Sequence, residues 1–188
     1  MDIPIFPLNT VLFPGGVLPL KIFEQRYLEM TKVCLRDTAP FGVCLIREGI
    51  EVGAPALPAE VGCLARIVDW EMPQPGIFHL KAEGTQRFRL LQRQTQKSGL
   101  ITGQVDLLAA DQPMAADSSC RRVLELIIER VGERYFPSPR LDDASWVGYR
   151  LAEMLPLALA TRQEMLELDL PQQRIDFLRR YLQQQGLA

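Results

Sequence analysis

Histidine is nearly absent from this sequence of 188 residues, since His79 is the only one. A protein metal site needs several nitrogen or thiolate ligands, so a centre built on imidazoles is excluded. The sequence also has no Gly-x-Ser-x-Gly nucleophile elbow and no Gly-x-x-x-x-Gly-Lys phosphate loop. We therefore expect no catalytic residue, no metal and no cofactor, and a protein that is not an enzyme. A Cys–His dyad of Cys63 with His79 stays open, because both lie in runs that we predict to be paired strands.

Lysine is scarce as well, with four residues, and the formal net charge is −2 at a pI of about 5.5. Nucleic-acid binding usually depends on clustered cations that release counterions from phosphates. Arginine and lysine are here mixed with aspartate and glutamate along the chain. The composition therefore disfavours a nucleic-acid partner.

Long apolar runs are missing too. The most apolar stretch, residues 11–20, is interrupted by Pro14, Gly15, Gly16 and Pro19, which excludes a membrane-spanning helix there. The first residues lack the basic and apolar pattern of a signal peptide. The four cysteines form no Cys-x-x-Cys pair, and we expect them to be reduced and buried. We expect a cytoplasmic protein with no membrane partner.

The first half of the sequence is rich in glycine, proline and short β-prone runs. Gln74, Pro75 and Gly76 form a turn signal, so the runs on either side predict a hairpin. A single helical stripe with the spacing of a buried face interrupts the strands, at Phe23, Tyr27, Met30 and Cys34. The predicted strands cover residues 3–8, 41–47, 63–71, 77–83, 86–94 and 100–107. Many short strands with frequent turns favour a closed or nearly closed barrel.

The second half predicts four helices packed as a compact bundle. The first carries an apolar stripe from Leu124 to Tyr135 and stops at Pro137, with Ser118 and Ser119 as N-caps. The others carry apolar stripes in residues 147–155, 161–168 and 171–186. A capping box from Thr161 to Glu164 opens the helix over residues 161–168. A polar break that ends in proline, residues 109–113, separates the halves. We therefore expect a barrel domain over residues 1–110 and a helical subdomain over residues 111–188.

An unusual apolar segment, residues 6–20, lies within the first half. It holds more bulky side chains than a solvent-exposed loop should. One reading is that it crosses the barrel and fills its core. The other is that part of it stays exposed as an apolar groove for a partner segment, with Phe13, Val17, Leu18 and Leu20 as the binding residues.

Several motifs are spaced like those of a known family. They are Ile5-Phe6-Pro7-Leu8-Asn9, Leu12-Phe13-Pro14-Gly15, Leu18-Pro19-Leu20, Ile22-Phe23-Glu24-Gln25-Arg26-Tyr27, Glu51-Val52-Gly53, Val61-Gly62-Cys63, Ala65-Arg66-Ile67 and Glu83-Gly84-Thr85-Gln86-Arg87-Phe88. This series resembles the N-terminal, substrate-binding domain of Lon proteases, and cereblon carries a similar domain. The resemblance implies an α+β fold, in which a mainly antiparallel PUA-like β pseudo-barrel with one embedded helix precedes a helical bundle.

The resemblance also bears on function. It implies a protein- or peptide-binding module of the Lon type, without the ATPase and peptidase parts of Lon. Two alternatives are a PUA-like reader of RNA or nucleotides and an accessory factor that delivers substrates to a protease. We expect Glu24 and Arg26 to fix the embedded helix to the barrel, using Arg66 or Arg87. The motif residues with an expected structural role are Pro7, Pro14, Gly15, Phe23, Glu24, Arg26, Tyr27, Gly62, Arg66, Gly84, Arg87 and Phe88.

Overall fold

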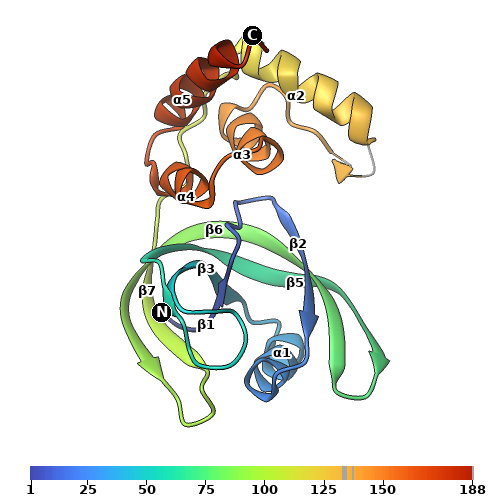
Figure 1. The fold of residues 1–188 in the computed structure, drawn as a ribbon, viewed down its shortest axis with the longest axis vertical. Coiled ribbons are helices and arrows are strands. Elements are labelled where there is room, and N and C mark those ends of the chain that lie inside the picture. The colour runs from blue at the N-terminus through green and yellow to red at the C-terminus, as the bar shows by residue number, and fades with distance from the viewer. Residues whose placement is uncertain (133–134, 137, 188) are drawn as a thin grey trace. The chain divides into compact units, whose positions relative to one another are not determined.

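The structure is a computed structural model that describes residues 1–132, 135–136 and 138–187. The chain forms two compact units, Met1–Ala109 and Ala110–Ala188 (Figure 1). We call them the barrel unit and the helical unit. No helix among the described residues combines the length and the apolar character needed to cross a membrane.

The barrel unit closes its sheet into a ring. Its elements are β1 (Asp2–Leu8), β2 (Val17–Ile22), α1 (Gln25–Asp37), β3 (Phe41–Glu48), β4 (Leu57–Pro58), β5 (Val61–Gln74), β6 (Ile77–Thr95) and β7 (Ile101–Leu107). The ladder runs β1–β7–β6–β5–β3, and a pairing of β3 with β1 completes it. The β1–β3 pairing is parallel and the others are antiparallel. A parallel pair needs a crossover, which the chain makes through α1.

The predicted strands are confirmed, with differences at β2, at the two-residue β4, which was not predicted, and at β6. The hairpin turns at Pro75 and Gly76, where Gln74 lies opposite Ile77. The strands predicted over residues 77–83 and 86–94 are one long strand, β6, that continues through Gly84. The second half of the apolar segment is a strand, β2, which pairs antiparallel with β6. The sequence reading missed β2, because prolines at positions 14 and 19 are typical of a loop.

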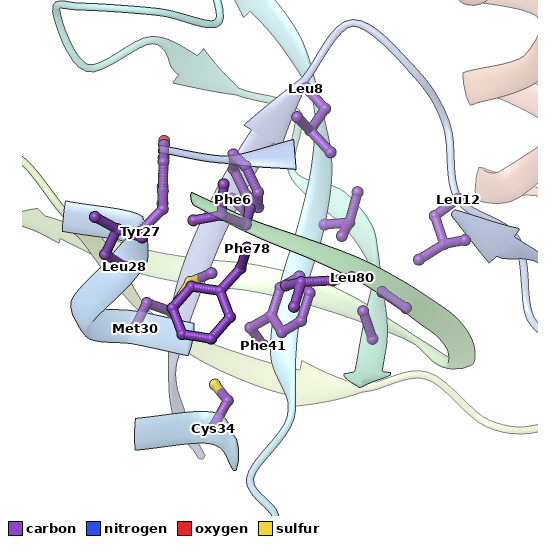
Figure 2. Close-up of a cluster of buried hydrophobic side chains, with 14 of the residues drawn as sticks. Phe6, Leu8, Leu12, Tyr27, Leu28, Met30, Cys34, Phe41, Phe78 and Leu80 are labelled. Carbon is purple, nitrogen blue, oxygen red and sulfur yellow. The ribbon is translucent and has the colours of Figure 1, made fainter. Parts of the chain in front are cut away.

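The main core of the barrel unit lies between α1 and the sheet (Figure 2). As predicted for the helical stripe, Tyr27, Met30 and Cys34 are buried there. Phe6 packs on Tyr27 with ring centroids 4.0 Å apart. Phe23 was assigned to the same stripe, and this was wrong. It precedes the first residue of α1 and remains 48% exposed.

The apolar segment enters β2 through a tight turn over residues 13–16. Pro14 and Gly15 occupy its central positions, Gly15 has a φ of 73°, and the Gly16 N–H donates to the Phe13 carbonyl at 2.9 Å. Proline followed by a residue with positive φ is the pattern of a type II turn. Two further backbone bonds hold the turn on β6. The Gly15 N–H donates to the Gly84 carbonyl at 2.7 Å, and the Gly84 N–H donates to the Gly16 carbonyl at 2.8 Å.

The helical unit has the four predicted helices, α2 (Ser118–Val131), α3 (Ala144–Met154), α4 (Leu159–Glu167) and α5 (Pro171–Gln184). The predicted caps were wrong. Asp117 rather than a serine caps α2, and α4 begins at Leu159, which places Thr161 inside the helix. The carboxylate accepts two N–H bonds at the start of α2, so it satisfies more of the helix end than a serine would. Pro137, the predicted stop, lies outside the described residues.

A buried arginine of α5 connects that helix with α3, with α4 and with the start of the helical unit. Arg174 of α5 is fully buried and lies with its guanidinium carbon 4.0 Å from the ring centroid of Tyr149 in α3. It donates hydrogen bonds to the Tyr149 hydroxyl at 3.1 Å and to a carboxylate oxygen of Asp111 at 3.0 Å. It also donates to the carbonyls of Met165 and Leu168, each at 3.2 Å. One side chain thus fixes the start of the unit to α3 and to the α4–α5 connection.

Glu153 gives the helical unit a pH-dependent stability. It accepts a hydrogen bond from Arg150 at 3.0 Å. Burial raises the pKa of Glu153 from 4.5 to about 7, although Arg150 and Arg162 act in the opposite direction. A carboxyl group whose pKa is higher in the folded state favours folding when it is protonated. Its contribution is therefore complete below pH 4.5 and is lost as the pH rises through about 7.

We expect Glu153→Gln to remove this pH dependence. In the unchanged protein the carboxyl should lower the free energy of unfolding by about 2 kcal/mol between pH 4.5 and pH 7.5. This change in the free energy of unfolding is smaller than the full pKa shift would give, because 24% of the Glu153 side chain is exposed and solvent screens its charge. Denaturant midpoints across this range, followed by the fluorescence of buried Trp146 in a Trp70→Phe background, measure the difference. An identical pH profile for both proteins would contradict the assignment.

Candidate functional site

The barrel unit has an apolar groove of about 320 Å³ beside β2. We call it the β2 groove. Its lining combines core side chains with the strand and with the segment that precedes β4. The lining residues are Phe6, Leu8, Thr10, Leu18, Pro19, Leu20, Lys21, Ile22, Phe23, Glu24, Tyr27, Glu51 and Val52. A second hollow, of about 490 Å³, adjoins the β5–β6 hairpin and shares Pro19, Leu20 and Lys21 with the groove.

The four predicted binding residues do not all reach this surface. Phe13 is fully buried, so its side chain cannot line an open groove, and that assignment is corrected. Its carbonyl accepts the bond that closes the turn. Leu18 and Leu20 are half-buried and line the β2 groove. Val17 is 59% exposed at the start of β2, outside the lining.

The alternation along β2 explains this division. Leu18, Leu20 and Ile22 point to one face of the strand, and exposure falls from half-buried at Leu18 and Leu20 to fully buried at Ile22. Val17 and Lys21 point to the other face and are exposed. The sequence reading missed Phe23 and Val52 as groove residues. The Glu51-Val52-Gly53 motif was the available signal, but its position opposite β2 depends on the fold.

Two carboxylates fix the rim of the β2 groove. Glu24 pairs with Arg26 at 3.0 Å and accepts a bond from the Gly53 N–H at 3.3 Å. Glu51 accepts a bond from the Asn9 N–H. The segment that precedes β4 is therefore tied to the start of α1 and to the residue after β1. Charge-assisted bonds of this kind are stronger than neutral ones and position the rim.

Arg26 anchors α1, as predicted, through a backbone carbonyl and an aromatic ring. Its guanidinium donates to the Gly99 carbonyl at 3.2 Å and lies 4.6 Å from the ring centroid of Tyr27. Arg66 instead pairs with Glu83 at 3.2 Å across the β5–β6 hairpin. Arg87 is buried in β6, opposite Cys63 in the ladder. The predicted use of Arg66 was wrong because its strand position directs it to the exposed face of the hairpin.

Tyr27 contributes an uncharged surface to the groove. Desolvation by burial raises the pKa of Tyr27 to about 12, although the positive charge of Arg26 lowers it. The phenol therefore stays protonated at any physiological pH. The floor of the groove is thus aromatic and aliphatic, and its charges are confined to Lys21, Glu24 and Glu51.

The proposed Cys–His dyad is wrong. His79 is exposed and its Nδ1 lies 3.0 Å from a carboxylate oxygen of Glu71, whereas Cys63 is fully buried. In the β5–β6 ladder Cys63 lies opposite Arg87, and Glu71 lies opposite His79. The eight-residue separation along β5 corresponds to roughly 25 Å at the rise of an extended strand. The two side chains therefore cannot exchange a proton.

The other thiols are also unsuited to chemistry. Burial raises the pKa of Cys34 to about 11 and that of Cys120 to about 12. Burial also raises the pKa of Cys44 far above the usual range. The described residues contain no group of three or more histidine, cysteine, aspartate or glutamate side chains that could hold a metal ion. All four cysteines are buried thiols outside disulfides, as predicted.

The glycines of the motifs allow close approach of strands. A Cβ at Gly62 would lie 2.5 Å from the Val43 carbonyl oxygen and 2.6 Å from the Phe88 ring. A Cβ at Gly84 would lie 2.3 Å from the Phe13 carbonyl oxygen. Phe88 itself is fully buried, and Pro7 pairs with Cys44 where β1 and β3 close the ring. These motif residues therefore form the barrel rather than a reactive site.

The closed ring followed by four helices is the fold of known Lon N-terminal domains. The solved structure of a Lon N-terminal domain protein from Xanthomonas campestris has a TM-score of 0.81 and 34% sequence identity, and the match covers 96% of this chain and 98% of that one. The predicted α+β class, with a mainly antiparallel PUA-like pseudo-barrel and a helical bundle, is confirmed. A model of the ATP-dependent protease La (LON) substrate-binding domain matches residues 2–184. The chain belongs to this family.

Two relatives show how much of a larger protein this match represents. Lon protease 2 of Myxococcus xanthus is 34% identical over 106 residues, which are 55% of this chain and 13% of the relative. Protein cereblon of Xenopus tropicalis is 29% identical over 111 residues, which are 57% of this chain and 24% of the relative. The chain thus spans less than a quarter of the length of either. The family match is to the substrate-binding domain and not to an ATPase or a peptidase.

Proposed function

We propose that this protein is a non-catalytic module that binds exposed apolar segments of other polypeptides in the β2 groove. The observation that carries the proposal is the groove itself, an open apolar surface formed by Leu18, Leu20, Phe23 and Val52. Soluble proteins usually bury such contiguous apolar surface or use it for binding. Membership of a family described as substrate-binding supports a polypeptide as the partner.

The polar rim supports the same function. Apolar lining with a few positioned polar groups is the usual composition of a binding site, because the apolar surface provides affinity and the polar groups provide orientation. Here Glu24 and Glu51 are held by backbone N–H bonds and remain beside the apolar surface. Unfolded polypeptides expose both apolar side chains and backbone polar groups, so they match both components of the groove.

The proposal predicts that neutral polar substitutions in the groove weaken binding of unfolded protein. We expect Leu20→Gln to reduce affinity by about tenfold or more, because burial of a leucine side chain contributes about 1.5–3 kcal/mol. Phe23→Gln should also weaken binding without disturbing a strand, since Phe23 lies between β2 and α1. Fluorescence anisotropy with a reduced, alkylated and labelled client protein gives the dissociation constants.

Leu91→Gln provides the matched control. Leu91 is a half-exposed leucine of β6 that lines neither hollow. Its substitution removes a similar apolar surface and should leave affinity unchanged within about twofold. Thermal unfolding of each variant establishes that the fold persists. Equal affinity for the control and the groove variants, or no binding of any unfolded client, would contradict the proposal.

A further inference from the structure

The free edge of β2 adds a second binding element to the groove. Among the strands that the structure describes, β2 pairs only with β6 (Figure 1). Its six residues therefore have one edge in the ladder and one edge without a strand partner. A strand edge of this kind presents backbone N–H and C=O groups that can pair with another extended chain.

The orientation of these groups follows from the turn. The Gly16 carbonyl accepts a bond from the Gly84 N–H, so the carbonyl of residue 16 faces β6, while its N–H closes the turn. Alternation along an antiparallel strand then directs the backbone N–H and C=O groups of Leu18, Leu20 and Ile22 toward β6 as well. Pro19 is consistent with this phase, because proline in a strand places its nitrogen on the free edge. The free edge consequently offers three carbonyls, of Val17, Pro19 and Lys21, and the N–H groups of Val17 and Lys21.

The apolar β2 groove lies next to this edge. The β2 groove and the hollow beside the β5–β6 hairpin both include Pro19, Leu20 and Lys21 in their lining. An extended chain along the edge would place every second side chain over the same face as Leu18 and Leu20. Edge pairing provides affinity through the main chain, and the adjacent hollows select alternate side chains.

The charges of the rim favour one type of occupant. The charge of Glu24 is offset by Arg26 at 3.0 Å. Glu51 accepts a bond from the neutral Asn9 N–H and forms no ion pair within the described residues. Among the described residues, Glu51 is therefore a carboxylate of the lining that has no ion-pair partner, although Lys21 lines the same groove. A lysine or arginine next to the apolar side chains of an occupant would complement this carboxylate.

From these observations we propose that the occupant is an extended polypeptide segment that adds to β2 as an extra strand. Alternate apolar side chains of the segment enter the β2 groove, and a flanking lysine or arginine pairs with Glu51. This inference rests on the proposed function and specifies the conformation and the sequence class of the bound polypeptide. Proline at position 19 and the charge of Lys21 disfavour pairing of the edge with a second copy of β2.

The first test uses a short peptide in which leucine alternates with threonine and one end carries lysine. Single N-methylation at each position of the peptide removes one backbone donor at a time. Strand addition predicts a period of two, in which methylation at every second residue weakens binding by tenfold or more and the intervening positions tolerate it. Hydrogen exchange followed by NMR should also show slower exchange of the Val17 and Lys21 N–H groups in the complex.

The second test concerns the flanking charge. Glu51→Gln keeps an oxygen that can accept the Asn9 N–H and removes the charge. We expect it to abolish a preference of about fivefold or more for the lysine-flanked peptide over its threonine-flanked counterpart. Glu164→Gln, at an exposed position of α4, makes the same change in net charge and should keep the preference.

The outcomes separate this inference from the proposed function. Binding of unfolded client that depends on Leu20, together with uniform tolerance of N-methylation, would overturn strand addition and leave the proposed function standing. Absence of binding for both client and peptide would overturn both. Dimerisation of the protein through β2 that the peptide fails to compete would make a second copy the occupant, and would also overturn the inference.

Discussion

Replacement of Arg174 by methionine should destabilise the helical unit by about 3–5 kcal/mol, the largest effect that we expect from a single side chain of that unit. The substitution removes four hydrogen bonds, to Asp111, Tyr149, Met165 and Leu168. It also removes the Arg174 cation from the carboxylate of Asp111, which is 6% exposed. Removal of one member of a buried ion pair is costly, because the remaining carboxylate loses an interaction that offsets its desolvation. Urea unfolding monitored by Trp146 fluorescence in the Trp70→Phe background measures this loss.

Two controls separate the buried pair from general effects on α5. Arg179→Met removes an exposed arginine that pairs with Asp176 at 3.1 Å on the same helix. A surface pair of this kind contributes about 0–1 kcal/mol. Asp111→Asn combined with Arg174→Met removes both charges of the pair and should recover part of the loss. Equal destabilisation by the Arg174 and Arg179 substitutions would refute the role of the buried cluster.

The helical unit was the part of the fold that the sequence predicted most directly. Its helices carry apolar stripes of their own, and Pro171 occupies a first-turn position at the start of α5, where its lack of an N–H has no cost. The role of Arg174 was not predicted. An arginine within a polar run is typical of a solvent-exposed face, and only the packing of α3 against α5 encloses it.

The strands of the barrel were predicted because their alternation is local, whereas β2 was missed because its partner is not. Val17–Ile22 pairs with residues about sixty positions later in the chain, and nothing within the segment indicates this. For the same reason, the sequence left open whether the apolar segment of residues 6–20 is buried or exposed. The segment is both, since Phe13 is fully buried and Leu18 and Leu20 line the groove.

The motifs of the family were recognised without knowledge of what they do. Gly84 illustrates the difference. In the sequence it is the glycine of a Gly-x-x-Arg-Phe element. In the structure β6 continues through it without a break. In the structure it is the point where the turn over residues 13–16 rests on the sheet. That function depends on the distance between two backbones, which no local pattern specifies.

Gly84→Ala should therefore destabilise the barrel unit by about 2–4 kcal/mol, although alanine is favoured over glycine within a strand. The added Cβ would lie 2.3 Å from the Phe13 carbonyl oxygen, which the Gly16 N–H fixes in place. The turn must move, and the bonds that connect Gly15 and Gly16 with Gly84 are then weakened or lost. Since this turn leads directly into β2, we also expect weaker binding of unfolded client. Thermal unfolding and the anisotropy assay measure the two effects.

Gly76→Ala is the informative comparison, because the two glycines differ in the reason for their presence. Gly76 has a φ of 82° at the tip of the β5–β6 hairpin, and a Cβ there would meet nothing within 4 Å. Its replacement costs only the strain of a positive φ, about 1 kcal/mol, and should leave binding unchanged. A Gly84 variant as stable as the Gly76 variant would show that the turn can retreat from β6. The edge of β2 would then be positioned by its own ladder with β6 alone.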